Sequence, residues 1–335
     1  MLAIRLHALG DMVLTLPYLH ALRRVVPHAE LDFLTRREVA DIPRGIVLFD
    51  RVFQIGGGRD HRRQLLSALA LVPRLRLRRY DVVLDLQRNR VSRAVRRLLG
   101  ASAWSEFDRF SPRLAGDRVR STIEAAGFGP LRVHPELQLH DAGGGSDKLR
   151  AAGWDGAADI VVLNPASTFP GRRWPIQSYE RFARLWLERI SNATQFMVLG
   201  LPSLRREAEM LERALQHRLL NLVGRTSVIE AFALVRRASL VLSEDSGLMH
   251  MAWVVGTPTL ALFGASRSDW SRPHGTYSDC LAACRGAEHD CIIDGRCHAA
   301  PPICLEEVSP EAVLQRALEL LHRTAERAKS IDAGA

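Results

Sequence analysis

Apolar and polar residues alternate along the first half of the chain in blocks that are typical of strands and helices in turn. Short apolar runs predict strands at residues 2–6, 30–34, 52–55 and 80–87. Between the first two runs, leucines at helical spacing predict a helix that starts at Asp11 and ends before Pro27, with Pro17 in its early part. This strand–helix–strand order is typical of a parallel sheet with right-handed crossover connections.

The same alternation restarts in the second half, after the glycine-rich break Gly143–Ser146, and we place a linker between about 140 and 157. Strands are predicted at 160–163, 196–199, 219–223, 240–242 and 258–263, and helices at 179–190, 205–217, 228–236 and 310–328. The sequence therefore predicts an α/β protein with domains at 1–145 and 157–308, and a C-terminal helix and tail at 309–335. Ligands of such sheets bind beyond the carboxyl ends of the strands, so we expect the site in the cleft between the halves.

Composition narrows the class of protein and of partner. The chain has 335 residues, of which 47% are hydrophobic and 25% charged, as in an ordinary globular protein with room for two domains. A formal net charge of +9 favours an anionic partner, such as a phosphorylated small molecule or an anionic membrane surface. Aromatic residues make up only 6%, and no RNA-binding aromatic motif occurs, so nucleic acid is disfavoured.

The segment 239–253, SLVLSEDSGLMHMAW, joins a predicted buried strand to a helix. Asp245, Ser246 and Gly247 stand at this junction, where free backbone N–H groups and the positive end of the helix dipole suit a phosphate. His250 follows one turn later, on a face that could meet the same anion. In the alternative interpretation, Asp245 or Ser246 only caps the helix and His250 packs on a neighbour.

A second anion-receptive loop follows the strand at 160–163. Its sequence is NPASTFPGRRWP, in which Ser167 and Thr168 offer hydroxyl groups, and Arg172 and Arg173 offer guanidinium groups that suit a diphosphate. Both loops come at strand ends of the same predicted sheet. Together they favour a phosphorylated ligand over two unrelated polar loops.

Five blocks occur in order along the chain: RLHALGDMVLTLPYLHALR, YDVVLDLQ, LNPAS…GRRWP, LSEDSGLMHMAW and GTPTLALFG. In order and spacing they resemble the heptosyltransferases of glycosyltransferase family 9, up to about residue 308. The resemblance implies a GT-B fold, in which two Rossmann-like domains face each other across a central cleft and the C-terminal one binds the nucleotide sugar. It also implies transfer of heptose from ADP-heptose to a lipopolysaccharide core, with inversion at the anomeric centre and without a catalytic metal.

Carried over by position, the resemblance gives Asp11 the role of catalytic base, which takes a proton from the acceptor hydroxyl group. The alternative for Asp11 is a structural N-cap. Arg172 stands where the family usually has a lysine that neutralises the leaving diphosphate, so its charge is kept and its geometry differs.

The remaining donor contacts follow the same resemblance. Ser167, Thr168 and Arg173 would bind phosphate, and so would the family's nucleotide-sugar turn, which matches Asp245, Ser246, Gly247 and His250. The family often has an acidic residue for the ribose after the strand that ends near Gly200. Here that segment reads LPSLRREAE, and Glu207 is the candidate.

A cysteine cluster departs from the family pattern. The chain's cysteines all lie in one segment, at Cys280, Cys284, Cys291, Cys297 and Cys304. Their spacing is not that of a standard zinc site, but clustered thiols in a reducing compartment suggest a structural zinc or iron. Related enzymes that glycosylate autotransporter proteins hold an iron through cysteines. Free buried thiols are the alternative.

We therefore expect an inverting glycosyltransferase of lipopolysaccharide assembly, with no cofactor required for catalysis. Alternatives are a family 9 enzyme that uses another sugar nucleotide or a protein acceptor, and a non-catalytic sugar-nucleotide-binding module, which would have no use for Asp11 as a base. A cytoplasmic location is expected, because no run of about 18 uncharged apolar residues and no signal-peptide cleavage site occurs. The sequence leaves open a peripheral contact with the inner face of the inner membrane.

Overall fold

The chain forms two units, Met1–His140 and Asp141–Ala335, in a computed structural model. The structure describes residues 1–332 except 8, 134–136, 167–171, 267 and 284–304. The division falls at the start of the segment that the sequence suggests as a linker. Most of that segment belongs to the second unit, where it forms helix α6 (Ser146–Ala151).

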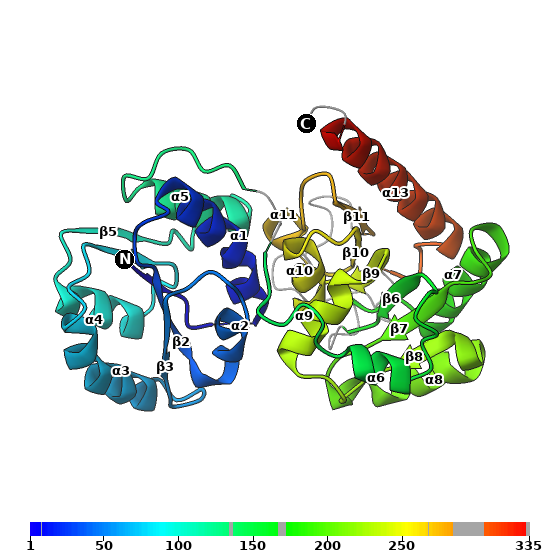
Figure 1. The fold of residues 1–335 in the computed structure, drawn as a ribbon, viewed down its shortest axis with the longest axis horizontal. Coiled ribbons are helices and arrows are strands. Elements are labelled where there is room, and N and C mark those ends of the chain that lie inside the picture. The colour runs from blue at the N-terminus through cyan, green and yellow to red at the C-terminus, as the bar shows by residue number, and fades with distance from the viewer. Residues whose placement is uncertain (8, 134–136, 167–171, 267, 284–304, 333–335) are drawn as a thin grey trace. The chain divides into compact units, whose positions relative to one another are not determined.

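A five-stranded parallel sheet forms the centre of the first unit, in the order β3-β2-β1-β4-β5. Its strands are β1 (Leu2–Ile4), β2 (Asp32–Arg36), β3 (Arg51–Ile55), β4 (Val82–Asp85) and β5 (Ala103–Glu106). Its described helices are α1 (Leu9–Val25), η1 (Arg37–Val39), α2 (Asp41–Arg44), α3 (His61–Arg76), α4 (Arg90–Leu99) and α5 (Ala115–Glu124). Helices α1 and α5 pack together on one side of the sheet, and α3 and α4 on the other (Figure 1).

A six-stranded parallel sheet forms the second unit, in the order β11-β10-β9-β6-β7-β8. Its strands are β6 (Ile160–Asn164), β7 (Gln195–Val198), β8 (Leu219–Asn221), β9 (Leu240–Glu244), β10 (Thr259–Phe263) and β11 (Ser278–Ala282). Its further described helices are α7 (Ile176–Arg189), η3 (Pro202–Leu204), α8 (Arg205–Leu215), η4 (Gln216–Arg218), α9 (Val228–Arg236), α10 (Gly247–Val254), α11 (Ser268–Ser271) and α13 (Pro310–Asp332).

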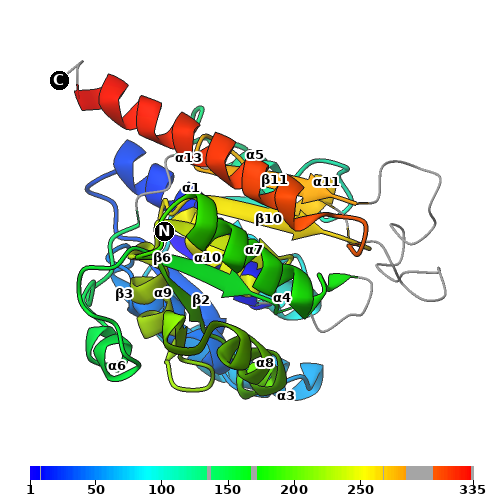
Figure 2. The same ribbon diagram turned by 90° about the vertical axis from the view of Figure 1, so that its right-hand side faces the viewer.

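The second unit has the larger aromatic core. Trp174, Tyr179, Phe182 and Phe196 are almost fully buried between the sheet and the helices α7, α8 and α13. Figure 2 shows α13 running beside α7 along the outside of this layer. Burial of such side chains is the main stabilising term, at roughly 1.5–3 kcal/mol each. The C-terminal helix is therefore part of this unit's core.

The structure confirms the predicted α/β class with two parallel sheets, and adds strands that the sequence did not indicate. Strands β5 and β11 lie at sheet edges, and their sequences AWSE and SDCLA lack the aliphatic runs of the central strands. An edge strand is paired on one side only, so polar residues there cost little. The final helix continues beyond the predicted end, to Asp332.

Candidate active site

The candidate residues of each unit gather where its strand order reverses. In the first unit β1 lies between β2 and β4, and in the second unit β6 lies between β7 and β9. The carboxyl ends of the strands at such a switch point are where open α/β sheets bind ligands. Asp11 follows β1, whereas Arg172 follows β6 and Asp245 follows β9.

Asp11 lies in the first turn of α1, and its side chain pairs with the residue that directly follows β1. Asp11 Oδ2 is 3.0 Å from Nη2 of Arg5, and 49% of the aspartate side chain is exposed. Since α1 begins at Leu9, Asp11 is inside the helix and does not occupy the N-cap position. Its carboxylate is therefore both oriented by an arginine and accessible to a ligand.

Arg5 is held in place on several sides. It is only 5% exposed, donates a hydrogen bond from Nη1 to the carbonyl oxygen of Leu86, and lies 5.0 Å from the ring centroid of Phe107. Burial lowers the pKa of Arg5, while the neighbouring Asp11 acts in the opposite direction. A cation fixed in this way gives Asp11 one defined partner.

The loop that leads into α1 is held by the end of the predicted strand YDVVLDLQ. Oε1 of Gln87 accepts hydrogen bonds from the backbone N–H groups of Leu6 at 2.9 Å and His7 at 2.8 Å. The buried Asp85 in turn accepts hydrogen bonds from the N–H groups of Gln87 and Arg88. The YDVVLDLQ block, one of those that carry the family resemblance, therefore holds the backbone that leads to the candidate base Asp11.

In the second unit, Ser246 is the N-cap of α10. Its Oγ accepts a hydrogen bond from the N–H group of Met249, and it also accepts one from Nδ2 of Asn164 at 2.8 Å. Asn164, the last residue of β6, donates to Ser243 as well. The capping interpretation of Ser246 is therefore confirmed. It is compatible with an anion nearby, because the first N–H groups of a helix remain without intrahelical acceptors.

Arg172 brings three strand-end loops together. Its Nη1 lies 3.6 Å from Oδ2 of Asp245, which follows β9, and its Nε donates to the carbonyl oxygen of Ala265, which follows β10. Arg172 itself belongs to the loop after β6. The two anion-receptive loops that the sequence singles out are therefore neighbours at one edge of this sheet.

Trp174 anchors the arginine-bearing loop. Its side chain is 2% exposed, its backbone N–H donates to Oε1 of Glu244 at 2.7 Å, and its indole N–H donates to the carbonyl oxygen of Val308. The ring also contacts Tyr179 edge to face. Burial and the neighbouring Glu244 carboxylate raise the pKa of Tyr179 well above its ordinary value. Arg172 and Arg173 directly precede this buried anchor and are held at the edge with it.

A cavity of about 430 Å³ adjoins this loop, and Arg173, Trp174, Glu207 and Glu244 contribute to its lining. Glu207 lies in the first turn of α8. Among the described residues its occluded Oε2 has no hydrogen-bond partner. A cavity lined by an arginine and a carboxylate oxygen with spare capacity can accept a ligand that carries both phosphate and hydroxyl groups.

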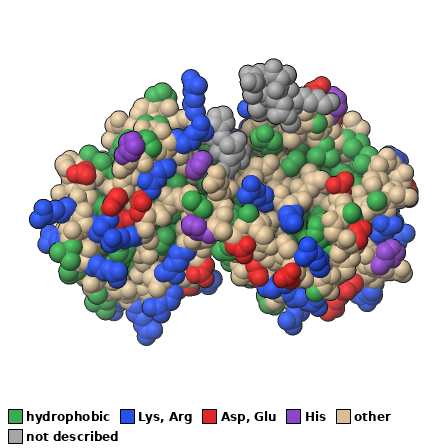
Figure 3. Space-filling view, viewed as in Figure 1, with side chains coloured by type: hydrophobic (Ala, Val, Ile, Leu, Met, Phe, Trp, Pro, Cys, Tyr) green, Lys and Arg blue, Asp and Glu red, His purple; other side chains and the backbone are tan. Residues whose placement is uncertain are grey.

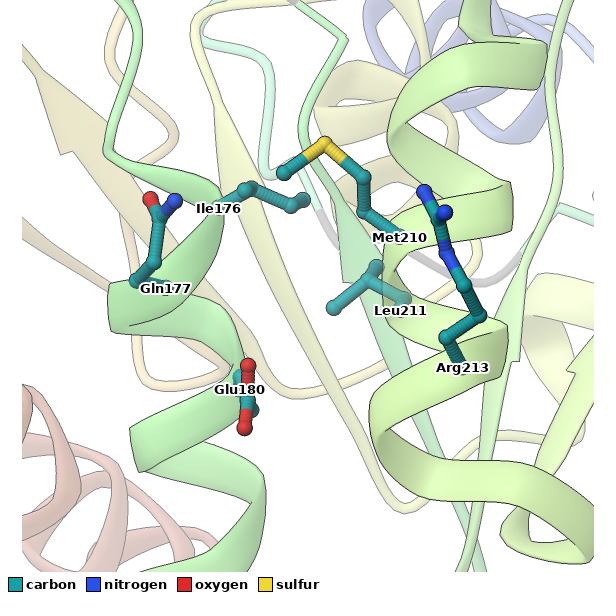
Figure 4. Close-up of a pocket in the computed structure, with 6 residues that line it drawn as sticks. All are labelled: Ile176, Gln177, Glu180, Met210, Leu211 and Arg213. Atoms are coloured by element: carbon teal, nitrogen blue, oxygen red, sulfur yellow. The ribbon is translucent and has the colours of Figure 1, made fainter.

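A smaller cavity of about 200 Å³ lies between α7 and α8. In Figure 4, Ile176 of α7 and Met210 of α8 point toward each other across it, and Glu180 and Arg213 line it further along the helices. It contains none of the candidate residues. It lies between the two helices and shares Ile176 and Met210 with the larger cavity.

The remaining candidates are two residues of α10 and two hydroxyl-bearing residues that precede Arg172 in the sequence. His250 lies in α10 and is 6% exposed, whereas Gly247 is that helix's first residue and is partly exposed. Ser167 and Thr168 lie outside the described residues.

The cysteine cluster also falls largely outside the described residues. Cys280 lies in β11 as a free thiol, whereas the other four predicted ligands, Cys284, Cys291, Cys297 and Cys304, are not described. Within the described part of the chain, no three His, Cys, Asp or Glu side chains gather closely enough to hold a metal ion. The structural zinc or iron stays a prediction.

Three residues of this region were missed by the sequence analysis. Arg5 and Gln87 lie inside blocks that were recognised, but their contacts depend on the pairing of β1 with β4. Glu244 sits beside the recognised turn, and a carboxylate at the end of an apolar strand was a visible signal of a role in that turn. None of the described helices is both long and apolar enough to cross a membrane.

Comparison with known proteins identifies the family. The profile of glycosyltransferase family 9 (heptosyltransferase) matches residues 68–293. The chain is 26% identical to lipopolysaccharide heptosyltransferase 1 of Pseudomonas aeruginosa over 293 aligned residues. The alignment covers 82% of this chain and 81% of that protein. It is 29% identical to lipooligosaccharide heptosyltransferase 2 of Haemophilus influenzae over 177 aligned residues. This alignment covers 50% of this chain and 48% of that protein, so the chain spans about half of that relative.

Solved structures give the same result at the level of fold. The E. coli ADP-heptose lipopolysaccharide heptosyltransferase II superposes with a TM-score of 0.74 at 20% identity, over 96% of this chain and 98% of that chain. A family 9 glycosyltransferase from Veillonella parvula superposes with a TM-score of 0.77 at 18% identity, over 96% of each chain. These similarities confirm the predicted GT-B class of two Rossmann-like units. The chain belongs to glycosyltransferase family 9, the heptosyltransferase family.

Proposed function

We propose that this chain transfers a heptose from ADP-heptose to a growing lipopolysaccharide core, with inversion at the anomeric carbon. Relatives named lipopolysaccharide heptosyltransferases support the reaction class, and one similar solved structure is an E. coli heptosyltransferase with ADP-2-deoxy-2-fluoro heptose. The observation that carries the proposal is the Arg172–Asp245 contact, which joins the two predicted phosphate-receptive loops.

On the donor side, the diphosphate lies against the N-terminus of α10 and the side chains of Arg172 and Arg173. Two guanidinium groups and the helix dipole together offset the charge that develops on ADP as it leaves, which is the largest expected contribution to catalysis. Ser167 and Thr168 add hydroxyl contacts to phosphate oxygens. Glu207 accepts a hydrogen bond from the ribose, for which its Oε2 is suited because it has no partner among the described residues.

On the acceptor side, Asp11 takes the proton of the attacking hydroxyl group. The acceptor oxygen forms a bond to the anomeric carbon as the bond from that carbon to the donor phosphate oxygen breaks, and ADP departs. A carboxylate within reach of the acceptor hydroxyl group is a suitable general base. Arg5 orients Asp11 for this step from a distance of 3.0 Å.

The acceptor is the part of the reaction that the residues constrain least. A core built on a lipid would bring the reaction to a membrane surface, so we also propose peripheral contact with the inner leaflet. A different sugar nucleotide or a protein acceptor would use the same base and the same diphosphate contacts. A pure binding module would not need Asp11 beside a buried arginine at the end of β1.

A donor panel tests the proposal. Calorimetric titration with ADP-heptose and with UDP-, GDP- and dTDP-sugars should give measurable affinity for ADP-heptose, on the order of tenfold or more above the others. Arg172→Ala should weaken ADP-heptose binding, whereas Arg213→Ala at the α7–α8 cavity should not. Tighter binding of another sugar nucleotide would overturn the assignment of ADP-heptose as donor.

A further inference from the structure

Helix α3 presents an apolar stripe to solvent. Leu66 is 68% exposed, Leu69 is 41% exposed and Leu77, at the C-terminal cap, is 84% exposed. Ala70 and Pro73 between them are exposed as well. These positions follow the i, i+3, i+4, i+7, i+11 spacing of one helix face, so they form a continuous strip and are not scattered surface leucines.

The opposite face of the helix already has a partner within its own unit. Gln64, Ala68, Val72 and Leu75 are buried, the last three among apolar residues of the first unit. The outer leucines are therefore not needed for the core. An amphipathic surface helix normally has polar residues at these outer positions. A second apolar face on the solvent side indicates that α3 contacts a partner outside this chain.

Arginines border the outer strip on both sides. Arg62 and Arg63 lie one turn before Leu66, at the N-terminal end of the strip, and Arg74 and Arg76 flank its C-terminal half on opposite sides, all exposed. Residues 59–79 contain seven arginines and one carboxylate, Asp60. That carboxylate is engaged as the N-cap of α3 and pairs with Arg63.

Most of these arginines have no carboxylate partner in the part of the chain that the structure describes. Within the described residues, no carboxylate lies at ion-pair distance from Arg62, Arg74 or Arg79. The neighbouring helix α4 differs, because Arg93 and Arg96 both pair with Glu106. Figure 3 shows basic side chains along the lower left edge of the molecule, in the region of α3 and α4 in Figure 1.

An anionic lipid surface fits this face better than a protein does. Leucines of an interfacial helix enter the boundary of the acyl chains while flanking arginines reach the phosphate headgroups. With 16 residues α3 is about 24 Å long, enough to lie along the surface. A second copy docked two-fold through the same face would place arginines against arginines.

We propose that α3 docks this protein on an anionic membrane, lying in the plane of the interface with Leu66, Leu69 and Leu77 inserted. The inference deepens the proposed function and rests on it, since a lipid-linked acceptor is found at such a surface. The docking itself requires neither donor nor acceptor. It can therefore be measured separately from transfer.

Vesicle co-sedimentation of the full chain tests the proposal, without donor or acceptor. Vesicles of phosphatidylcholine with about 30% phosphatidylglycerol should bind the protein on the order of tenfold better than pure phosphatidylcholine, and about 0.5 M salt should weaken binding. The double variant Leu66→Ser/Leu77→Ser should lose on the order of tenfold in vesicle affinity. Val25→Ser/Val47→Ser, at two exposed valines elsewhere in the same unit, is the matched control and should bind as the wild type does.

Two further measurements separate the outcomes. The Leu66→Ser/Leu77→Ser variant should keep wild-type turnover on a soluble core oligosaccharide, so loss of docking without loss of transfer supports the inference. Equal vesicle binding by this variant and the wild type would overturn it, as would no binding of the wild type. A wild-type dimer that this variant dissociates in analytical ultracentrifugation would assign the face to a second copy instead.

Discussion

Asp11 Oδ2 lies 3.0 Å from Arg5 Nη2, and the two side chains differ in exposure, at 49% for the aspartate and 6% for the arginine. The buried arginine is bound to the carbonyl oxygen of Leu86. Its position is therefore set by the sheet, and that position sets the orientation of the aspartate. A catalytic carboxylate needs this combination of a fixed direction and an accessible surface.

Asp11→Asn should abolish the proton transfer and leave the donor site intact. We expect kcat to fall by about 10²–10⁴-fold, the usual range for loss of a general base, with the Kd for ADP-heptose nearly unchanged. Steady-state kinetics and calorimetry measure the two quantities. Asp41→Asn in α2, where 83% of the side chain is exposed, is the matched control and should behave as the wild type does. Wild-type turnover by Asp11→Asn would exclude this base.

Arg5→Lys keeps the charge beside Asp11 and loses the fork that binds Leu86. We expect kcat to fall on the order of tenfold with little change in the KM for donor, because the lost interaction orients only the base. The same substitution in an Asp11→Asn background should have no further effect on kcat. An additive loss in the double variant would show that Arg5 acts independently of Asp11.

Arg172→Ala removes a cation from the proposed diphosphate site and should affect both binding and catalysis. Loss of a charge-assisted hydrogen bond corresponds to about 10–100-fold, so we expect ADP affinity and kcat/KM to fall within that range. Arg172→Lys, which restores the charge usual in the family, should recover part of the loss. Unchanged kinetics for Arg172→Ala would remove this residue from the donor site.

Glu106 accepts hydrogen bonds from Arg93 and Arg96 at 2.7–2.9 Å and pairs with Arg88 at 3.0 Å. The hydrogen bond from Arg93 holds the pKa of Glu106 below its ordinary value, so its contribution to stability exists above pH 4.5 and is lost as pH falls through the lowered pKa. Glu106→Gln should reduce the free energy of unfolding at neutral pH by about 1–3 kcal/mol. Urea denaturation measures it, with Asp41→Asn, whose side chain is 83% exposed, as the control.

His7, which follows the central strand β1, predicts a second pH dependence of the stability of the fold. Burial, followed by the charges of Arg36 and His61, lowers the pKa of His7 from its ordinary 6.5. Below pH 6.5 the unfolded chain binds this proton before the folded chain does, so His7 destabilises the fold as pH falls. We expect the stability of His7→Asn to decline less steeply than that of the wild type between neutral pH and the lowered pKa. Parallel declines would show that His7 is not responsible.

The sequence pattern was sufficient to predict the strands that are most deeply buried. Strands β6 and β9 begin with aliphatic runs and are buried along their whole length, and the polar residues that follow them lie at one edge, as expected. The edge strands β5 and β11 could not be predicted from hydrophobic patterning, because a strand that is paired on one side only tolerates polar residues.

Contacts between segments that are distant in the sequence could not be predicted either. The contacts of Arg5 and Gln87 arise from the register that pairs Ile4 with Asp85 across β1 and β4. Residues 80 or 81 positions apart meet there, and no local pattern encodes which side chains meet. The segment 59–79 is visibly basic in the sequence, but only the fold separates the outward leucines of α3 from its core residues.

Heptose transfer itself is the most direct test of the proposed function. ADP-heptose and a heptose-deficient lipopolysaccharide core are incubated with the wild type and with Asp11→Asn, and the product is analysed by mass spectrometry. We expect the wild type to add one heptose with stoichiometric release of ADP, and the variant to bind ADP-heptose without forming product. No transfer by the wild type from ADP-heptose, or equal transfer by Asp11→Asn, would contradict the account.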